Sequence, residues 1–259
     1  MWWAPSGLVA RRRAVSGAKA DAAARQNRHD RYVAISQQRT TGGDVRNYDD
    51  LLRVAIDRGV DEATLRAGSV PVESLDFVVG QVGRGPGLHV GNYAGVSLAY
   101  LAAHVDGVIV AVDPNVPFQG FSHPQDTVVR LLAAAGAQDR VVLVCGYSQS
   151  KNPSNQAWVH DDYDPATEWM NEFAPECVFE NLRELGVRFG WALLDGNHDP
   201  DYLRAELVAL ASLLVPDGLV FIDDCNQWWP EILDVFRAPP AGWTAAGTDG
   251  RIGVLRRSP

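Results

Sequence analysis

The sequence predicts an α/β domain whose mostly parallel sheet ends in an antiparallel hairpin and carries helices on both faces. Two observations support this prediction. From Gly87 onward, short apolar runs alternate with amphipathic segments of helical length, which is the pattern of a parallel sheet with crossover helices. The last segment, GWTAAGTDGRIGVLRR, instead contains two strand-like runs joined by Asp249-Gly250, a dipeptide typical of a hairpin turn.

Composition and charge narrow the class of protein. The chain has 259 residues, 46% hydrophobic and 21% charged, as in a soluble globular protein. Its net charge of −9 argues against nonspecific binding to nucleic acid or an anionic membrane, because both need a basic face. No apolar run approaches a membrane span or a signal-peptide core. We therefore expect a cytoplasmic protein with no membrane or nucleic-acid partner, and the sequence leaves self-association open.

Three cysteines, Cys145, Cys177 and Cys225, occur in the chain. They form no CxxC pair and no even disulfide framework, which suits a reducing compartment. Cys145 and Cys225 lie near the predicted site, and we expect them to be small buried residues rather than nucleophiles.

Two regions are expected to precede the sheet. Residues 1–30 are rich in Ala, Arg, Ser and Gly, which predicts a flexible extension with the Arg11–Arg13 run as a solvated basic tail. Residues 31–84 predict helices, because NYDDLLRVAIDRG and SVPVESLDFVVGQVG both carry apolar residues at helical spacing. Ser69 and Ser74 are possible caps of the second helix. We expect these helices to cover one edge of the sheet or part of a substrate site.

Residues 85–259 form the predicted α/β domain. A polar, aromatic insertion at 147–186, loop-like at first and helical from about Pro165, predicts a lid at the functional edge. The apolar runs predict strands near 86–90, 108–112, 140–145, 189–194 and 218–222, and helices near 95–105, 123–136, 200–214 and 229–237.

Carboxylates follow two neighbouring strands of this domain. The runs WALL and LVFI end in Asp195 and in Asp223-Asp224, and His198 comes shortly after the first run. Because neighbouring parallel strands end at the same edge of a sheet, where ligands bind, we expect these side chains to converge. Three carboxylates and a histidine suit a hard divalent metal ion and a general base. The alternatives are that Asp195 caps the next helix, for which Asp199 is better placed, and that Asp223-Asp224 is a solvated turn.

A glycine turn opens the domain. In GLHVGNYAGVSLAYLA, Gly91 permits a sharp turn after a strand, Gly95 permits close approach of backbone and ligand, and Ser97 lies in the first helical turn. Asp113 ends the next strand, where a carboxylate can accept hydrogen bonds from both hydroxyls of a ribose. This arrangement serves NAD and S-adenosylmethionine equally well, and an ordinary acidic turn remains the third interpretation.

Four motifs in register resemble one enzyme family. VGNYAGVSLAYLA is similar to the first motif of the small metal-dependent O-methyltransferases of the catechol and caffeoyl-CoA types, and RVVLVCGYSQS to their third strand and following turn. LLDGNH resembles their metal-binding strand end, and FIDDC their second metal pair. The DGxH form is closest to the branch with macrolide-sugar and antibiotic-tailoring methyltransferases. The resemblance covers about residues 85–257 and implies the Rossmann-like class I methyltransferase fold.

This resemblance implies a role for each matching residue. Asp195, Asp223 and Asp224 would bind Mg²⁺ or another divalent cation. His198 would be the general base, at the position where the catechol enzymes have a lysine. S-adenosylmethionine would be held by Gly91, Tyr93 and Ser97 at its methionine end, by Asp113 at the ribose, and by Tyr147, Ser148 and Gln149 at the adenine.

Several residues near these motifs carry open interpretations. His89 departs from the family pattern, which has an acidic residue there, and we expect a buried, backbone-bonded side chain. The segment His160–Asp164 (HDDYD) is a second metal site or, as we favour, a polar part of the lid. Trp228 and Trp229 are either core contacts of the next helix or a stacking platform at the mouth of the substrate site.

Together, the residues and the resemblance predict an S-adenosylmethionine- and Mg²⁺-dependent O-methyltransferase acting on a small-molecule acceptor, with His198 taking the hydroxyl proton. We favour a sugar hydroxyl or a glycosylated natural product as acceptor, because histidine replaces lysine and the insertion is long and polar. A phenol or catechol is the near alternative. From other classes, an NAD-dependent oxidoreductase and a non-catalytic cofactor-binding scaffold stay open.

Overall fold

The computed structural model describes residues 47–115, 124–149 and 177–258. The expected extension at 1–30, the HDDYD segment and most of the insertion at 147–186 lie outside the described residues. None of the helices in the described ranges combines the length and the apolar character needed to cross a membrane.

A seven-stranded sheet is the centre of the fold. Its strands are β1 (Gly87–Val90), β2 (Ile109–Asp113), β3 (Val141–Cys145), β4 (Phe189–Leu194), β5 (Leu214–Ile222), β6 (Trp243–Thr248) and β7 (Gly253–Arg257). They lie in the order β3-β2-β1-β4-β5-β7-β6. The first five strands pair in parallel, whereas β7 is antiparallel to both β5 and β6. The predicted α/β class with a terminal antiparallel hairpin is confirmed.

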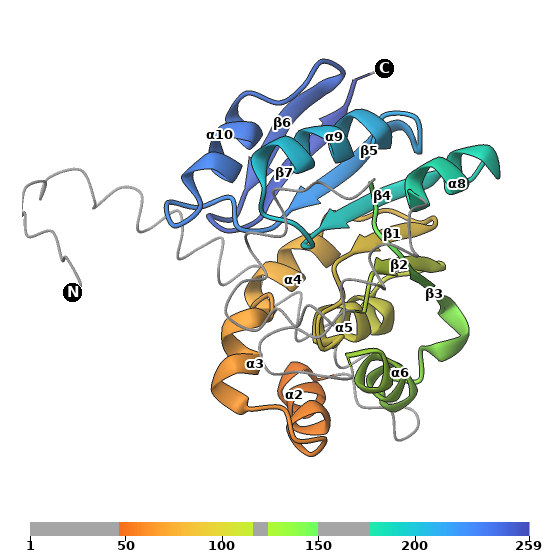
Figure 1. The fold of residues 1–259 in the computed structure, drawn as a ribbon, viewed down its shortest axis with the longest axis vertical. Helices are drawn as coiled ribbons and strands as arrows, with labels where there is room; N and C mark the ends of the chain where they lie inside the picture. The colour runs from red at the N-terminus through yellow and green to blue at the C-terminus, as the bar shows by residue number, and fades with distance from the viewer. Residues whose placement is uncertain (1–46, 116–123, 150–176, 259) are drawn as a thin grey trace, which may run out of the picture. The chain divides into compact units, whose positions relative to one another are not determined.

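Helices cover both faces of this sheet (Figure 1). The core of one face is shared by α2 (Tyr48–Ile56), α3 (Glu62–Gly68), α4 (Val72–Val79), α5 (Val96–His104) and α6 (Pro124–Ala134). The core of the other face is shared by α8 (Val178–Glu184), α9 (Pro200–Leu210) and α10 (Pro230–Arg237). The central strands are thus buried on both sides, which explains why WALL and LVFI are continuous apolar runs.

Local sequence signals set the beginnings of α2 and α9. Asn47 caps α2, and its side chain accepts a hydrogen bond from the backbone N–H of Asp49. Asp199 caps α9 by accepting from two backbone N–H groups, and Pro200 occupies the first helical turn, where a missing N–H is tolerated. Because Asp199 provides the cap, Asp195 does not serve that purpose.

The N-terminal helical region differs from the sequence expectation in two details. The additional helix α3 follows Asp61, whose carboxylate accepts from the backbone of Thr64. The expected serine caps are wrong, because α4 begins after Pro71 and Ser74 is buried within the helix. Ser69 lies between α3 and α4, as the residue that ends α3.

Of these helices, α2 packs on α5 and α6, α4 packs on α5, and α3 packs on α2. The Tyr48 hydroxyl donates to the Val70 carbonyl at 2.9 Å, and the Tyr48 ring meets that of Tyr100 edge-on. The Tyr100 hydroxyl in turn donates to Asp76 Oδ1 at 2.6 Å, which ties α5 to α4. The first helices therefore brace the helix that follows the glycine turn.

The fifth strand starts earlier than expected. β5 begins at Leu214, which pairs with Phe189, and α9 correspondingly ends at Leu210 rather than near 214. The register then shifts before Trp191 pairs with Leu219. Asp217 adopts a left-handed φ of 61° inside this irregular stretch. Pro216, Asp217 and Gly218, which are residue types that also favour a turn between elements, thus lie in an irregular stretch inside the strand.

The strand order changes direction at β1: β2 and β3 follow on one side of it, and β4 and β5 follow on the other. In open α/β sheets ligands bind at such a point, outside the carboxyl ends of the strands. Gly91 directly follows β1 and has a φ of +87°. A Cβ atom there would lie 2.1 Å from the Asp195 carbonyl oxygen. Only glycine therefore fits between the ends of β1 and β4.

We predict that Gly91→Ala lowers the free energy of unfolding by at least about 3 kcal/mol, because it combines overpacking with an unfavourable left-handed φ. Urea unfolding followed by circular dichroism measures the loss. Gly83→Ala is the matched control, since that exposed glycine has no atom within 4 Å of an added Cβ and no positive φ. Equal stability of the two variants would contradict this prediction, because it would show that the ends of β1 and β4 move apart at little cost in free energy.

Candidate active site

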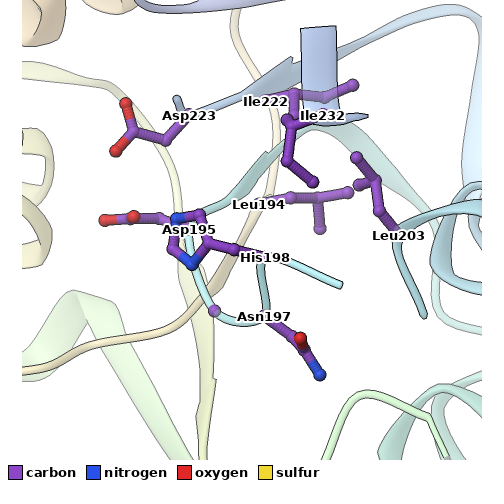
Figure 2. Close-up of a pocket in the computed structure, with 9 residues that line it drawn as sticks. Leu194, Asp195, Asn197, His198, Leu203, Ile222, Asp223 and Ile232 are labelled. Atoms are coloured by element: carbon purple, nitrogen blue, oxygen red, sulfur yellow. The ribbon is translucent and has the colours of Figure 1, made fainter. Parts of the chain in front are cut away.

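Two carboxylates meet at the carboxyl ends of β4 and β5. The backbone N–H of Asp195 donates to the Val90 carbonyl at 2.9 Å, and that of Asp223 donates to the Leu194 carbonyl at 3.0 Å. The sheet pairing thus continues one residue past the strands and holds Asp195 and Asp223 next to each other. Figure 2 shows both carboxylates pointing to one side, away from the apolar side chains of Leu203 and Ile232.

Asp224 completes this acidic cluster, which we define as Asp195, Asp223 and Asp224. Asp224 has a left-handed φ of 57°. Its Oδ2 lies 3.0 Å from His198 Nε2, so the two residues form a pair between the β5 end and the loop after β4. The predicted convergence of the carboxylates with His198 is therefore present in the structure.

An arginine that the sequence analysis did not identify enters the acidic cluster. Arg251 lies in the turn between β6 and β7, and it donates from Nε to Asp223 Oδ1 at 2.7 Å and from a terminal nitrogen to Asp223 Oδ2 at 2.6 Å. The same terminal nitrogen lies 3.4 Å from Asp224 Oδ1. The Asp223 side chain is only 1% exposed, so its charge is compensated by this bidentate pair and not by water.

Burial and charge shift the pKa values within this group. Burial and the neighbouring Asp223 carboxylate raise the pKa of Asp195 well above its usual range. Burial also acts to raise the pKa of Asp224, but the His198 hydrogen bond and the Arg251 charge outweigh it, so the net shift is downward. For Arg251, hydrogen bonds to Asp223 outweigh the opposing effect of burial and raise the pKa further.

His198 is held from two sides. Besides its contact with Asp224, its ring stacks on Trp229, with the ring centroids 4.7 Å apart and the planes 30° from parallel. Trp229 precedes α10 and packs against the core of that face, whereas Trp228 is 80% exposed. Of the two interpretations of this pair, core contact therefore applies to Trp229, and only Trp228 is free to form a platform.

The metal prediction concerns the same three carboxylates. Within the described ranges, no group of three His, Cys, Asp or Glu side chains is arranged to hold a metal ion. The oxygens of Asp223 and Asp224 instead contact the Arg251 guanidinium and the His198 ring. Magnesium binding by Asp195, Asp223 and Asp224 therefore stays a prediction.

The glycine turn and the end of β2 are joined by hydrogen bonds. Asp113 accepts from the backbone N–H of Asn92 at 2.6 Å and from that of Asn115, also at 2.6 Å. Burial raises the pKa of Asp113 even though these N–H groups oppose the shift. Asn92 Oδ1 is buried and has no hydrogen-bond partner among the described residues, and Tyr93 has a left-handed φ of 45°. Both residues lie in the turn predicted to hold the methionine end of a cofactor.

Gly95 and Ser97 begin the helix after the turn. A Cβ on Gly95 would lie 2.8 Å from Val128 Cγ2 of α6, so this glycine permits close packing of α5 on α6. The expected close approach of its backbone to a ligand stays a prediction. Ser97 is buried in the first turn of α5.

The turn after β3 is anchored to α9. The Ser148 hydroxyl donates to the Glu206 carboxyl group, and the Tyr202 hydroxyl donates to the Gln149 carbonyl at 3.1 Å. Burial raises the pKa of Glu206 to about 8, against the opposing effect of the Ser148 hydrogen bond. The side chain of Ser148 thus binds α9, whereas Gln149 Nε2 is buried with no hydrogen-bond partner among the described residues. Tyr147 is half-buried beside them.

Two further expectations, for His89 and for Cys145, differ from the structure in part. His89 is fully buried as expected, and burial lowers its pKa to about 4. Its ring nitrogens accept or donate no backbone hydrogen bond among the described residues, so the expected backbone bond is wrong, and the polar group that acts on the ring is the Asn92 side chain. Cys225 is buried, but Cys145 is exposed because it ends β3 at the border of the sheet.

The seven-stranded order and the convergence of strand ends define a class I methyltransferase fold. The family described as "methyltransferase domain" matches residues 88–225. Because this match spans more than half of the 259 residues, the chain belongs to the methyltransferase domain family. The methyltransferase expected from the resemblance is thereby confirmed over the NAD-dependent alternative, whereas metal dependence and the DGxH branch stay predictions. No curated protein matches the sequence.

Solved structures share this fold over nearly their whole length. The chain covers 93% of the O-methyltransferase TomG from Streptomyces achromogenes, solved with SAM, with 86% of its own length, a TM-score of 0.50 and 15% identity. It covers 96% of an O-methyltransferase from Bacillus cereus, solved with SAH, with 89% of its own length, a TM-score of 0.50 and 15% identity. The fold is that of S-adenosylmethionine-dependent O-methyltransferases.

We predict that the free energy of unfolding falls as the pH rises, because ionisation leaves a charge at the buried Glu206. The neutral form of Glu206 is favoured in the folded chain, so its contribution is full below a pH of about 4.5 and is lost as the pH passes its folded pKa of about 8. Between these values, the unfolding free energy of the wild type should fall relative to that of Glu206→Gln by up to about 1.4 kcal/mol per pH unit.

Urea unfolding from pH 5 to pH 9 measures this difference, and Glu180→Gln on the exposed face of α8 is the control. A pH-independent difference between the wild type and Glu206→Gln would show that Glu206 is ionised in the folded chain at all these pH values.

Proposed function

We propose that the chain transfers a methyl group from S-adenosylmethionine to a hydroxyl of a small-molecule acceptor, with His198 as general base. The observation that supports this function best is the His198–Asp224 pair at the carboxyl ends of β4 and β5, beside the switch point of the sheet. Histidine is the side chain most often used to accept a proton near neutral pH. O-methyl transfer needs such a group, since a protonated hydroxyl is a poor nucleophile.

The surroundings of His198 suit a base that must keep one orientation. The Asp224 carboxylate accepts from Nε2 when that nitrogen carries a proton, and Trp229 stacking fixes the plane of the ring. A carboxylate paired with a histidine also stabilises the charged imidazolium that forms when the ring takes a proton. His198 is 23% exposed, so an acceptor hydroxyl can reach it from solvent.

The residues at the other half of the site fit S-adenosylmethionine. When bound, this cofactor supplies an electrophilic methyl group. Gln149 Nε2 after β3 is a buried donor without a hydrogen-bond partner among the described residues, whereas the buried Asn92 side chain in the glycine turn interacts with the His89 ring. Buried polar atoms are costly when unpaired, which favours a polar ligand beside Gln149. We assign Gly91, Tyr93 and Ser97 to the methionine end.

Magnesium fits this arrangement poorly. The acidic cluster has the oxygen ligands that Mg²⁺ prefers, and the family resemblance implies that it binds there. However, a divalent cation would have to displace the Arg251 guanidinium, which already bonds both oxygens of Asp223. Two cations sharing these carboxylates would repel each other across a buried site. We therefore assign no step of the reaction to Mg²⁺.

We propose a sugar or a glycosylated natural product as the acceptor, as the histidine at position 198 and the polar insertion favour. The exposed Trp228, next to Trp229 in the chain, supports this choice, because a flat exposed aromatic ring can stack on a sugar face. A phenol or catechol acceptor is the second candidate, and residues 150–176, which lie outside the described residues, belong to the segment expected to discriminate between them.

We predict that the chain binds S-adenosylmethionine and that Asp113→Ala weakens this binding roughly 10- to 100-fold, as expected for the loss of a charge-assisted hydrogen bond. Isothermal titration calorimetry with S-adenosylmethionine, and with NAD as the negative control, measures it. Asp106→Ala, an exposed carboxylate after α5, should bind like the wild type. Unchanged affinity in a folded Asp113→Ala would remove Asp113 from the cofactor site.

We predict that His198→Ala lowers kcat roughly 10²- to 10⁴-fold, the contribution typical of a general base, and leaves the affinity for S-adenosylmethionine unchanged. Transfer of a radiolabelled methyl group to a panel of glycosides and catechols provides the rate. Val208→Ala, at a residue 63% exposed on α9, is the control. A wild-type rate for His198→Ala across the pH range would eliminate His198 as the base.

A further inference from the structure

The Arg251 guanidinium holds a central position among the charged groups of the site. It makes two hydrogen bonds to Asp223, at 2.7 and 2.6 Å, and lies 3.4 Å from Asp224. Asp224 in turn meets His198 at 3.0 Å. One cation is therefore connected to two of the three acidic residues and, through Asp224, to the proposed base.

The β6–β7 turn is built to deliver this guanidinium. Asp249 Oδ1 accepts from the backbone N–H groups of Arg251 and Ile252, at 2.8 and 2.7 Å, which fixes the backbone of the turn. The Arg251 carbonyl accepts from the backbone N–H of Cys225 at 2.7 Å and so ties the turn directly to the residue after Asp224. The Arg251 side chain is only 29% exposed. These contacts hold the Arg251 side chain at the acidic cluster without the help of a ligand.

We propose that Arg251 is the built-in cation of the acidic cluster and that it replaces the divalent ion implied by the family resemblance. A bidentate guanidinium–carboxylate pair uses both oxygens of the buried Asp223. It also fixes the Asp224 carboxylate that orients His198, so Arg251 is a positioning residue. The chain accordingly binds no divalent ion at this cluster and, if the proposed methyl transfer is correct, carries it out without one.

The arrangement accounts for three facts that a metal site leaves unexplained. If Asp223 were a metal ligand, it would not need Arg251 to donate to both of its carboxylate oxygens. The Asp249 turn would have no reason to hold Arg251 against Cys225. Asp223 is 2% exposed, and a carboxylate so deeply buried requires a permanent partner that is present whether or not an ion is available.

Metal binding is the direct test, and it needs no acceptor. Electron paramagnetic resonance of Mn²⁺ titrated with the full chain should show no bound Mn²⁺ at micromolar protein for the wild type. Arg251→Met removes the charge but keeps the bulk of the side chain, and it should gain one Mn²⁺ site, which Asp223→Asn in the same chain should abolish. Arg256→Met, at an exposed arginine on β7, should behave like the wild type.

Either of two results would overturn the proposal. The first is stoichiometric Mn²⁺ binding by the wild type that is lost in Asp223→Asn. The second is a folded Arg251→Met that binds S-adenosylmethionine but gains no Mn²⁺ site. The wild-type titration decides the question even if Arg251→Met fails to fold, and Arg251→Lys, which keeps a cation, should restore the wild-type result.

Activity separates this inference from the proposed function. Methyl transfer by the wild type to whichever glycoside or catechol it accepts should be the same in EDTA and in added Mg²⁺. Arg251→Met should lower kcat at least 10-fold in EDTA, with unchanged affinity for S-adenosylmethionine, because the Asp224–His198 pair loses its fixed partner. Abolition of wild-type transfer by EDTA would contradict the role of Arg251. Absence of transfer under both conditions would contradict the proposed function, while the Mn²⁺ result would stand.

Discussion

A buried carboxylate must have a partner, and Asp223 shows how much of this site follows from that constraint. Asp223 lies at the end of a central strand with covered faces, where solvent cannot stabilise its charge. Its compensation comes from Arg251, which lies outside the parallel part of the sheet. The ion pair therefore links the last parallel strand to the terminal hairpin and fixes the edge at which the remaining functional groups converge.

The hairpin consequently has a chemical role beyond closing the sheet. Antiparallel pairing of β7 with β5 brings Gly253 opposite Ile222, directly before the acidic pair. A Cβ on Gly253 would lie 2.7 Å from Cys225 Sγ, so the hairpin approaches the end of β5 as closely as glycine permits. This proximity allows the side chain of Arg251 to reach Asp223 and Asp224. The antiparallel tail that served as a sign of fold class thus also supplies charge to the site.

Periodicity and turn chemistry predicted most of the fold, but they could not predict which side chains pair across it. The acidic strand ends and His198 were expected to meet, because parallel strands end at one edge and chain order reveals that edge. Arg251 and Glu206 were missed, because their partners are 28 and 58 residues away and belong to elements whose contacts local patterns do not encode. The spacing of Glu206 from Tyr202, Leu203 and Leu210 was the available signal, because it places the carboxyl group on the apolar face of the helix, where it needs a partner. The bulge in β5 was missed because Pro-Asp-Gly also signals a turn between elements.

The charges of the site support a base rather than a second acid in the proposed reaction. The acidic cluster sets three carboxylates against the single guanidinium of Arg251, and burial together with the adjacent Asp223 charge raises the pKa of Asp195. Asp224 differs from Asp195, because its contacts with His198 and Arg251 lower its pKa and keep it ionised. An imidazolium at His198 would therefore lie beside an ionised carboxylate whose charge is only partly balanced. The site thus places a carboxylate partner at 3.0 Å from the ring that would take a proton from an acceptor hydroxyl, and such a partner is what a general base requires of its surroundings.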